Sequence, residues 1–295
     1  MKPKIVITVP AYNEENSISW VIKEIKEVMD NTSYEYQILV LDDGSKDKTV
    51  ELAKKAGAIV FSNLSNRGLA ETFRIEMKKC LELNADIIVH TDADGQYLSK
   101  DIPRLIKKIE EGYDLVLGSR FGRSVKHMPL LKRFGNKVFA IVFKHLTKIK
   151  LTDTTTGFRA FTRNVAEDIE YINKFTYTQE QIIKASKQKF RITEIPIETR
   201  KTRPSRLFKN PFEYAIKAWI NIFRIYRDYD PLKFFGTIGI SFLLLGFIIA
   251  IYFLYLHIFG GGIIGHLGLL FLMLLLIMGG IQIIFFGFLA DMNRN

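Results

Sequence analysis

The chain has 295 residues, a formal net charge of +11 and a single cysteine. One cysteine excludes an intrachain disulfide framework and a cysteine-based zinc site. The basic excess is typical of proteins whose partners carry negative charge, but the sequence contains no nucleic-acid recognition motif, so no nucleic-acid partner is expected.

Short apolar runs alternate with segments of helical spacing through the first part of the chain. We expect strands at residues 4–9, 37–41, 58–62, 86–91 and 115–118. We expect helices at residues 17–29, 49–56, 70–83 and 101–111. This alternation predicts an α/β fold with a mostly parallel, Rossmann-like sheet and helices on both faces. Residues 1–209 are expected to form this single large domain.

Residues 210–231 are predicted to form an amphipathic helix that follows the domain. Asn210 and Pro211 suit a helix N-cap and first turn. One face of the helix is apolar and contains Phe212, Ile216, Trp219, Ile220 and Phe223. Such a helix could lie in a membrane interface or pack on the domain, and the sequence leaves both arrangements open.

No Asp, Glu, Lys or Arg occurs between Phe234 and Ala290. Because a hydrocarbon core about 30 Å thick needs about 20 apolar residues per helix, we expect two membrane spans, at residues 232–259 and 263–290. Basic residues precede the first span and Arg294 follows the second, so the positive-inside rule places the large domain on the cytoplasmic side of a cell membrane. Basic residues beside a span also suit anionic headgroups or a phosphorylated lipid.

Acidic residues follow three of the expected strands, at residues 10–15, 42–45 and 92–96. Ligands of parallel sheets bind beyond the carboxyl ends of the strands. No glycine-rich phosphate loop is present, so a bound nucleotide would need acidic groups and a metal ion. Asp92 and Asp94 flank one residue and could face a common Mg²⁺ or Mn²⁺ ion. The alternative is that these aspartates only cap the following turn.

Seven short motifs together resemble one enzyme family. They lie at residues 10–14, 42–45, 66–68, 92–96, 118–121, 153–159 and 194–197. Taken in order, they resemble the family 2 glycosyltransferases of the GT-A fold, and in particular the polyprenyl-phosphate (dolichyl-phosphate) hexose synthases. The resemblance covers about residues 4–207. It implies that one hexose is transferred, with inversion, from a nucleotide sugar to a membrane-embedded lipid phosphate; UDP-glucose, UDP-N-acetylhexosamine and GDP-mannose remain open as donors.

The resemblance also assigns roles to individual residues. It places the nucleotide-sugar site at Pro10, Tyr12, Glu14, Asp42, Asp43, Arg67, Asp92 and Ala93. It implies that the Mg²⁺ or Mn²⁺ ion is held by Asp94 and Gln96. It assigns catalysis to Asp92, Asp94 and Arg120. It assigns the acceptor phosphate to Ser119, Arg120, Arg133, Arg200 and Arg206, although Arg133 could equally belong to a solvated helix face.

Two further positions are Arg203 and Glu180. Arg203 stands where these synthases carry glycine, so the loop that leads to Arg206 is expected to have a different backbone. Glu180 lies where family 2 enzymes that glycosylate hydroxyl groups carry an acidic base. It is a base, a contact to metal or substrate, or an ordinary helix residue, and a phosphate acceptor favours the last two.

Two other functions are alternatives to lipid-phosphate transfer. Extension of a lipid-linked oligosaccharide or polysaccharide at a hydroxyl acceptor would require a true base, whereas a lipid phosphate is already an anionic nucleophile that needs positioning and charge neutralisation. An inactive lipid-binding scaffold is disfavoured by the intact motifs around Asp94 and Arg120. The sequence leaves the oligomeric state open, a homo-oligomer included.

Overall fold

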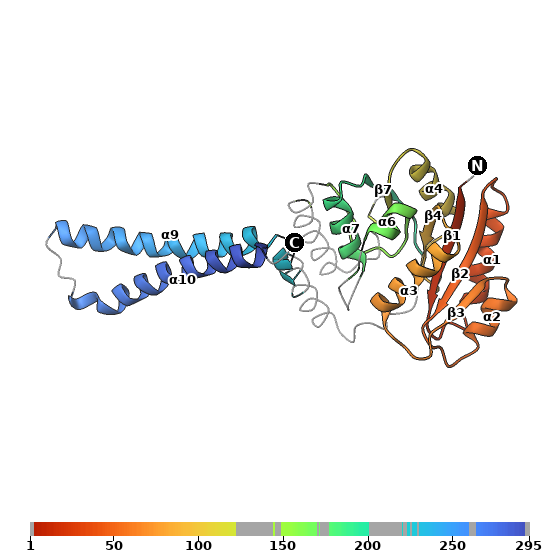
Figure 1. The fold of residues 1–295 in the computed structure, drawn as a ribbon, viewed down its shortest axis with the longest axis horizontal. Coiled ribbons are helices and arrows are strands. Elements are labelled where there is room, and N and C mark those ends of the chain that lie inside the picture. Colours follow the sequence, from red (N-terminus) through yellow and green to blue (C-terminus); the bar gives the residue numbers. More distant parts are fainter. Residues whose placement is uncertain are drawn as a thin grey trace. The chain divides into compact units, whose positions relative to one another are not determined.

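The computed structural model describes residues 3–121, 144, 149–169, 171, 177–200, 220, 223–224, 226–228, 230–259 and 264–292. The chain divides into two units, Met1–Ala215 and Ile216–Asn295 (Figure 1). Arg133 and Arg206 lie outside the described residues, and so does most of the helix expected at residues 210–231.

One sheet organises the first unit. Its strands in the described residues are β1 (Lys4–Ala11), β2 (Glu35–Asp42), β3 (Ile59–Ser62), β4 (Ile87–His90), β5 (Leu115–Ser119), β6 (Arg159–Thr162) and β7 (Ile192–Pro196). They lie in the order β3-β2-β1-β4-β6-β5-β7. Neighbouring strands are parallel except at β6, which runs antiparallel to both β4 and β5. The expected mostly parallel sheet is therefore confirmed, with one reversed strand inside it.

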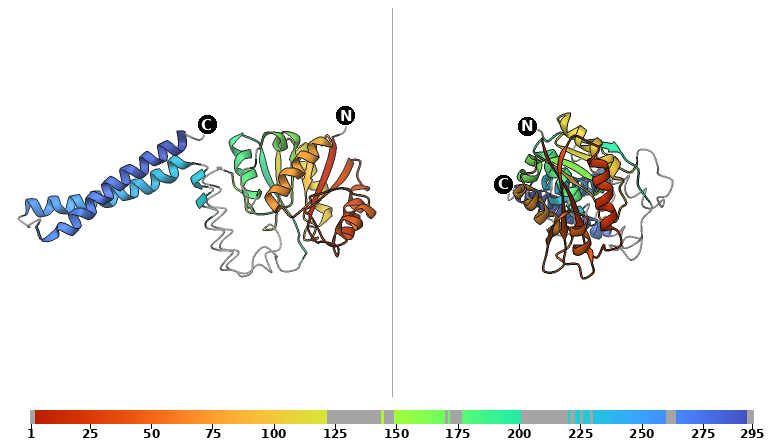
Figure 2. Two further views of the ribbon diagram at one scale, coloured as in Figure 1. Left: turned by 60° about the horizontal axis from the view of Figure 1, so that its bottom comes forward. Right: turned by 90° about the vertical axis from the view of Figure 1, so that its right-hand side faces the viewer.

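Helices cover both faces of this sheet (Figures 1 and 2). They are α1 (Ile18–Met29), α2 (Thr49–Lys55), α3 (Leu69–Glu82), α4 (Ile102–Glu110), α6 (Arg163–Asp168) and α7 (Thr178–Lys187), with a 3-10 turn, η1 (Ser99–Asp101), before α4. Ile22 of α1 and Leu105 of α4 share one buried cluster with Val89 of β4. The next residue, His90, points to the opposite face because strand side chains alternate, and its ring packs against Phe73 of α3.

The helices and strands expected between residues 4 and 118 are all present. Their ends differ from the expected ends by two residues or fewer, which is the usual uncertainty of such boundaries. The hydrophobic spacing of the sequence therefore predicted the elements that build this part of the sheet.

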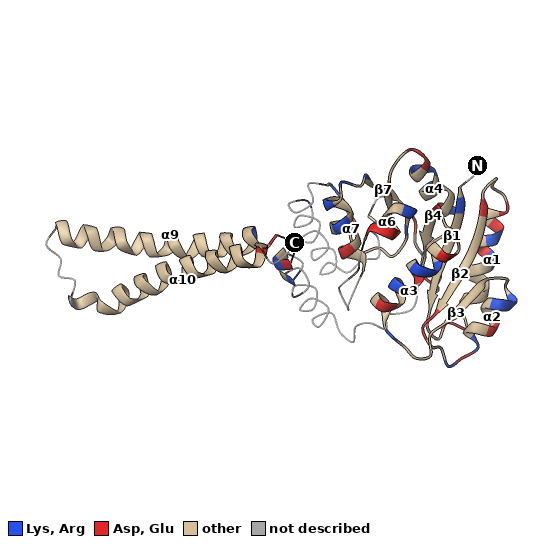
Figure 3. Cartoon of the chain, in the orientation of Figure 1, with Lys and Arg blue, Asp and Glu red and all other residues tan. Residues whose placement is uncertain are grey.

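The second unit contains two long apolar helices, α9 (Pro231–Ile258) and α10 (Leu267–Met292), with a 3-10 turn, η2 (Ile264–His266), before α10. An 18-residue stretch of each helix has a mean hydropathy of 2.5 in α9 and 2.7 in α10, and both helices are long and apolar enough to cross a membrane. Figure 3 shows that charged residues are frequent in the first unit and nearly absent along these helices. The expected spans at residues 232–259 and 263–290 are thus present as helices that are candidates for crossing a membrane.

Glycines line the contact between α9 and α10. Gly239 and Gly246 are buried on α9, and Gly280 and Gly287 are buried on α10. A Cβ atom added to Gly239 would lie 2.7 Å from the carbonyl oxygen of Gly280, and one added to Gly280 would lie 2.8 Å from that of Gly239. The two backbones therefore touch at this point, as is common where small residues bring membrane helices together.

We expect Gly239→Val to destabilise the helical hairpin by about 1–3 kcal/mol, because the new side chain has no space against Gly280. The measurement is the thermal unfolding of full-length protein in detergent, followed by far-ultraviolet circular dichroism. Gly236→Val is the matched control on the same helix, since a Cβ atom there would meet nothing within 4 Å. Equal unfolding temperatures for the two variants would contradict the observed helix contact.

Candidate active site

The carboxyl ends of β2, β1 and β4 meet at one edge of the sheet, with β1 between the other two. Ala11 at the end of β1 is paired with Asp42 of β2, and Thr8 is paired with His90 of β4. Just past β2, the backbone N–H of Asp43 donates to the carbonyl oxygen of Ala11 at 2.8 Å. The acidic strand ends singled out in the sequence thus lie along one edge.

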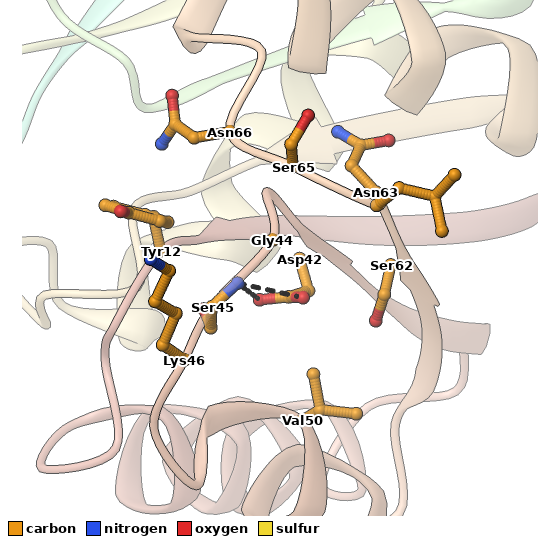
Figure 4. A pocket seen from close by; sticks show the side chains of 11 residues that line it. Tyr12, Asp42, Gly44, Ser45, Lys46, Val50, Ser62, Asn63, Ser65 and Asn66 are labelled. Carbon is orange, nitrogen blue, oxygen red and sulfur yellow. Dashed lines mark hydrogen bonds between the residues drawn. The ribbon is translucent and has the colours of Figure 1, made fainter.

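A pocket of about 550 Å³ opens beside the ends of β1, β2 and β3 (Figure 4). It is lined by Tyr12, Asp42, Gly44, Ser45, Lys46, Val50, Ser62, Asn63, Leu64, Ser65 and Asn66. The Asp42 carboxylate accepts from the backbone N–H of Ser45, at 3.1 and 3.3 Å to its two oxygens. Tyr12 and Asp42 are the members of the predicted nucleotide-sugar set that line this pocket. The other members do not line it: Pro10, Glu14, Asp43, Arg67, Asp92 and Ala93.

Several of these lining residues were not predicted. Ser62 ends β3 and Asn63 follows it, in the strand next to β2. A third parallel strand places its carboxyl end at the same edge as its neighbours. The polar residues after the strand expected at residues 58–62 were therefore the signal that could have found this side of the pocket.

Asp43 stabilises the loop at residues 63–68 beside the pocket. Its side chain is buried and accepts hydrogen bonds from the Asn63 side-chain amide at 2.9 Å and from the backbone N–H groups of Arg67 and Gly68 at 2.9 and 3.0 Å. Asp43 therefore fixes the loop that supplies one side of the pocket, while its neighbour Asp42 lines the pocket itself.

We expect Asp43→Ala to lower the free energy of unfolding by about 1–3 kcal/mol, because three partly buried N–H donors of the 63–68 loop lose their common acceptor. Asp42→Asn is the matched control in the same turn, since asparagine keeps a carbonyl oxygen for Ser45 and should change stability far less. Chemical denaturation of both variants checks the expectation. Equal stabilities would mean that the loop does not depend on Asp43.

Asp92 and Asp94 follow β4 in a tight turn. The Asp92 carboxylate lies against Gly157, where an added Cβ atom would come within 3.0 Å of Oδ1. Asp94 Oδ1 accepts from the backbone N–H of Gln96 at 2.9 Å, so the turn is closed by one of the candidate ligands. Ala93, between the two aspartates, is buried.

The electrostatics of this turn favour a cation. Desolvation raises the pKa of Asp92 to about 6; His90 and Arg120 oppose the shift, and the Asp94 carboxylate adds to it. In the described part of the chain, no group of three or more His, Cys, Asp or Glu side chains could hold a metal ion. A pair of carboxylates nevertheless suits Mg²⁺ or Mn²⁺ when phosphate oxygens of a substrate complete the coordination. The donor set thus fits a cation bound together with a diphosphate.

Arg120 follows β5, and a loop at residues 152–155 fixes its guanidinium group. Nε and Nη2 donate to the two carboxylate oxygens of Asp153 at 2.6 and 2.9 Å, and Nη2 also donates to Thr155 Oγ1 at 2.8 Å. Burial acts to raise the pKa of Asp153, but the Arg120 charge and the hydrogen bonds from Arg120 and Thr155 together outweigh it, so the pKa is lowered. The Arg120 side chain remains 20% exposed, so it is anchored on one side and accessible on the other.

Two further candidates have partners of their own. Arg200 donates to both carboxylate oxygens of Glu24, with Nη1 and Nη2 at 2.9 and 2.6 Å, which places it beside α1. Glu180 lies in the first turn of α7, 3.0 Å from the Lys184 ammonium group, and its side chain is 12% exposed. The sequence-based roles of both residues stay predictions.

A sequence profile of glycosyl transferase family 2 matches residues 6–170. The chain belongs to glycosyl transferase family 2. The dolichyl-phosphate hexose transferase of Haloferax volcanii is 32% identical over 197 residues, which are 66% of this chain and 82% of that protein. The UDP-N-acetylglucosamine–dolichyl-phosphate N-acetylglucosaminyltransferase of Methanococcus voltae is 31% identical over an alignment of 218 residues that covers 66% of this chain and 85% of that protein. The expected resemblance is confirmed, and this protein is a glycosyltransferase.

The GT-A fold expected for a family 2 glycosyltransferase is also confirmed. Glucosyl-3-phosphoglycerate synthase of Mycobacterium tuberculosis, solved in complex with Mn²⁺, UDP and phosphoglyceric acid, aligns with a TM-score of 0.58 and 21% identity. The alignment covers 75% of this chain and 78% of that one. At this identity the likeness concerns the fold, and the Mn²⁺ ion and nucleotide are properties of that enzyme.

A buried layer of polar side chains adjoins the end of β4, and the sequence did not reveal it. It contains His90, Glu76 and Tyr177. His90 and Glu76 are fully buried, with His90 Nε2 3.5 Å from a Glu76 carboxylate oxygen. The Tyr177 hydroxyl lies 3.2 Å from the same nitrogen. Burial acts to lower the pKa of His90, but the charges of Glu76 and Asp92 and the contact with Glu76 together outweigh it, so the pKa is raised. A protonated His90 would therefore support a negative charge on Asp92.

Arg159, the last residue of the motif at residues 153–159, is fully buried in the same layer. Nη1 donates to the Thr178 carbonyl at 3.0 Å and to Gln181 Oε1 at 2.8 Å, and Nη2 donates to the Thr156 carbonyl. It thereby joins β6 to the start of α7. The motif was visible in the sequence, but the internal role of its arginine depends on contacts that only the fold creates.

Proposed function

We propose that this family 2 glycosyltransferase transfers one hexose from a nucleotide sugar to a polyprenyl phosphate of the dolichyl type, with inversion at the anomeric carbon. The observation that carries the proposal is the presence in one chain of a family 2 site and an apolar helical hairpin. A polyprenyl phosphate is confined to the membrane, so its transferase benefits from an anchor. The names of the two relatives, which both act on dolichyl phosphate, support the same acceptor.

On the donor side, the nucleoside would occupy the pocket lined by Tyr12 and Asp42. The Asp42 carboxylate accepts hydrogen bonds and suits an N–H group of the base or a ribose hydroxyl. Asp94, with Gln96, would hold Mg²⁺ or Mn²⁺, which neutralises charge on the diphosphate leaving group when bound. Asp92, which packs against Gly157, would face the sugar and ribose.

On the acceptor side, an oxygen of the lipid phosphate would attack the anomeric carbon. The new bond forms from an oxygen lone pair, and the electrons of the broken bond leave with the nucleoside diphosphate. The phosphate is already ionised, so no protein base has to remove a proton. Arg120, fixed on one side by Asp153 and exposed on the other, would align and neutralise that phosphate, with Ser119 beside it.

We further propose that α9 and α10 span the membrane and that the first unit lies on its cytoplasmic side. The hydropathy and length of both helices support the spans. Arg227 before α9, Lys233 in the first turn of α9 and Arg294 after α10 support the orientation.

The test is transfer of radiolabelled sugar to dolichyl phosphate in detergent with Mn²⁺, using UDP-glucose, UDP-N-acetylglucosamine and GDP-mannose in parallel. Label in the organic phase with one donor is the expected result, and it also identifies the sugar. No label with any donor, from protein that still binds nucleotide, would contradict a lipid-phosphate acceptor.

Glu180→Gln distinguishes the two acceptor chemistries. We expect the variant to keep most of its turnover with dolichyl phosphate, because an ionised phosphate requires no base and Glu180 is already paired with Lys184. Initial rates of sugar transfer by the variant and the wild type provide the measurement. Loss of turnover by about 10²-fold or more would instead indicate general-base catalysis and a hydroxyl acceptor.

A further inference from the structure

The aromatic ring of Trp20 packs on the turn that carries Asp94. Gly95 in this turn has a φ angle of +70°, and a Cβ atom there would overlap the ring of Trp20 on α1. Trp20 is 41% exposed, so its ring is a surface aromatic that packs directly on the turn. A positive φ angle is open to glycine at little steric cost, but glycine also gives the turn conformational freedom. The tryptophan ring limits that freedom.

Arg200 connects this ring to the rest of the site. Its guanidinium carbon lies 5.4 Å from the centre of the Trp20 ring. The same guanidinium group forms the two-point contact with Glu24, which stands one helical turn after Trp20 on α1. The backbone N–H of Arg200 donates to the carbonyl oxygen of Gln96 at 2.8 Å, which lies in the turn itself.

The segment after β7 adds one more link to the turn. Thr199 and Tyr97 form an antiparallel β-bridge next to the Arg200–Gln96 hydrogen bond. The turn is thus held from two directions, by the Trp20 ring and by the backbone of residues 199–200.

We propose that Trp20, Glu24 and Arg200 form a clamp that positions the Asp94–Gln96 turn for the metal–diphosphate group of the donor. Arg200 is then a positioning residue on the donor side, in place of a contact to the acceptor phosphate. The inference rests on the proposed function in one respect, namely that Asp94 binds the cation.

The energetics favour a joint action of the three residues. The Arg200 and Glu24 side chains are 40% and 22% exposed, and an exposed ion pair alone contributes about 0–1 kcal/mol. Stacking on a tryptophan ring and a two-point contact both restrict the arginine side chain. Residues that orient metal ligands typically change metal affinity by about 10- to 100-fold when they are replaced.

The test is Mn²⁺ binding by full-length protein in detergent, with UDP or GDP present, measured by electron paramagnetic resonance of free Mn²⁺. We expect Glu24→Gln and Trp20→Ala to weaken Mn²⁺ binding about tenfold. Trp20→Phe should retain part of the Mn²⁺ affinity that Trp20→Ala loses. The Michaelis constant for dolichyl phosphate should not change. Glu27→Gln is the matched control, since it removes the same charge from an exposed position of α1.

The outcomes separate this inference from the proposed function. If wild-type protein binds Mn²⁺ and Asp94→Asn does not, while Glu24→Gln and Trp20→Ala bind as wild type, the clamp is overturned and the donor site stands. If Arg200→Gln raises the Michaelis constant for dolichyl phosphate without weakening Mn²⁺ binding, Arg200 belongs to the acceptor site and the clamp is likewise overturned. If wild-type protein binds no Mn²⁺ with either nucleotide, the metal assignment fails and the clamp fails with it.

Discussion

Replacing Asp94 with asparagine is expected to abolish metal-dependent binding of the nucleotide sugar and to lower turnover about 10²- to 10³-fold. The amide has nearly the shape of the carboxylate and can still accept from the backbone N–H of Gln96, so the turn should keep its conformation. It lacks the negative charge that a hard divalent cation requires. Calorimetric titration with UDP and GDP, with and without Mn²⁺, measures the loss directly.

Asp86→Asn provides the control for this experiment. Asp86 precedes the other end of β4, where its carboxylate accepts from the backbone N–H of Lys4 at 2.8 Å. The Asp86→Asn substitution therefore removes the same charge as Asp94→Asn, but at the end of β4 that is distant from the candidate ligands. It should leave nucleotide binding unchanged. Metal-dependent binding that persists in Asp94→Asn would remove Asp94 from the set of ligands and leave its carboxylate with a structural role in the turn.

Replacing Arg120 is the second change with a large expected effect. Arg120→Ala should lower the specificity constant for the lipid phosphate about 10²- to 10³-fold while the affinity for the donor is preserved, because the proposed role of the arginine is to neutralise charge on the acceptor side. The measurement is steady-state kinetics with dolichyl phosphate varied, alongside nucleotide binding. Loss of donor binding would move Arg120 to the nucleotide side of the site.

Stability must be measured together with this activity. Arg120→Ala leaves the buried Asp153 carboxylate without its cation, and breaking such a pair typically costs about 3–5 kcal/mol. Arg120→Lys is therefore the companion variant, because it keeps a positive charge near Asp153 but loses the planar two-point geometry. If Arg120→Lys folds normally and still has the kinetic defect, the effect belongs to the acceptor site.

The sequence predicted those features that depend on local pattern. Apolar runs that stop at Pro10, at Asp42 and shortly before Asp92 predicted both the strands and the edge where their acidic ends meet. The reversed strand β6 was not predicted, because its place between β4 and β5 is set by pairing with segments that are distant in the sequence.

The parts of the site that were missed depend on contacts across the fold. Arg200 meets Glu24 across 176 positions of sequence, and Glu76 meets His90 through the packing of α3 on the sheet. Nothing in the local sequence marks either contact. Asp42 and Asp43 are neighbours in one motif, yet only the backbone geometry shows that one lines the pocket and the other fixes a loop.

The lengths of α9 and α10 bear on the kind of bilayer that suits this enzyme. The helices contain 28 and 26 residues, which correspond to about 42 and 39 Å at a rise of about 1.5 Å per residue. A typical hydrocarbon layer is about 30 Å thick, so helices of this length would have a positive hydrophobic mismatch in the proposed membrane-spanning arrangement. The hairpin would relieve that mismatch by tilting or by stretching nearby acyl chains, and each response has a small free-energy cost that falls as the bilayer thickens. The anchor would therefore also act as a sorting signal, enriching the enzyme where the membrane is thickest.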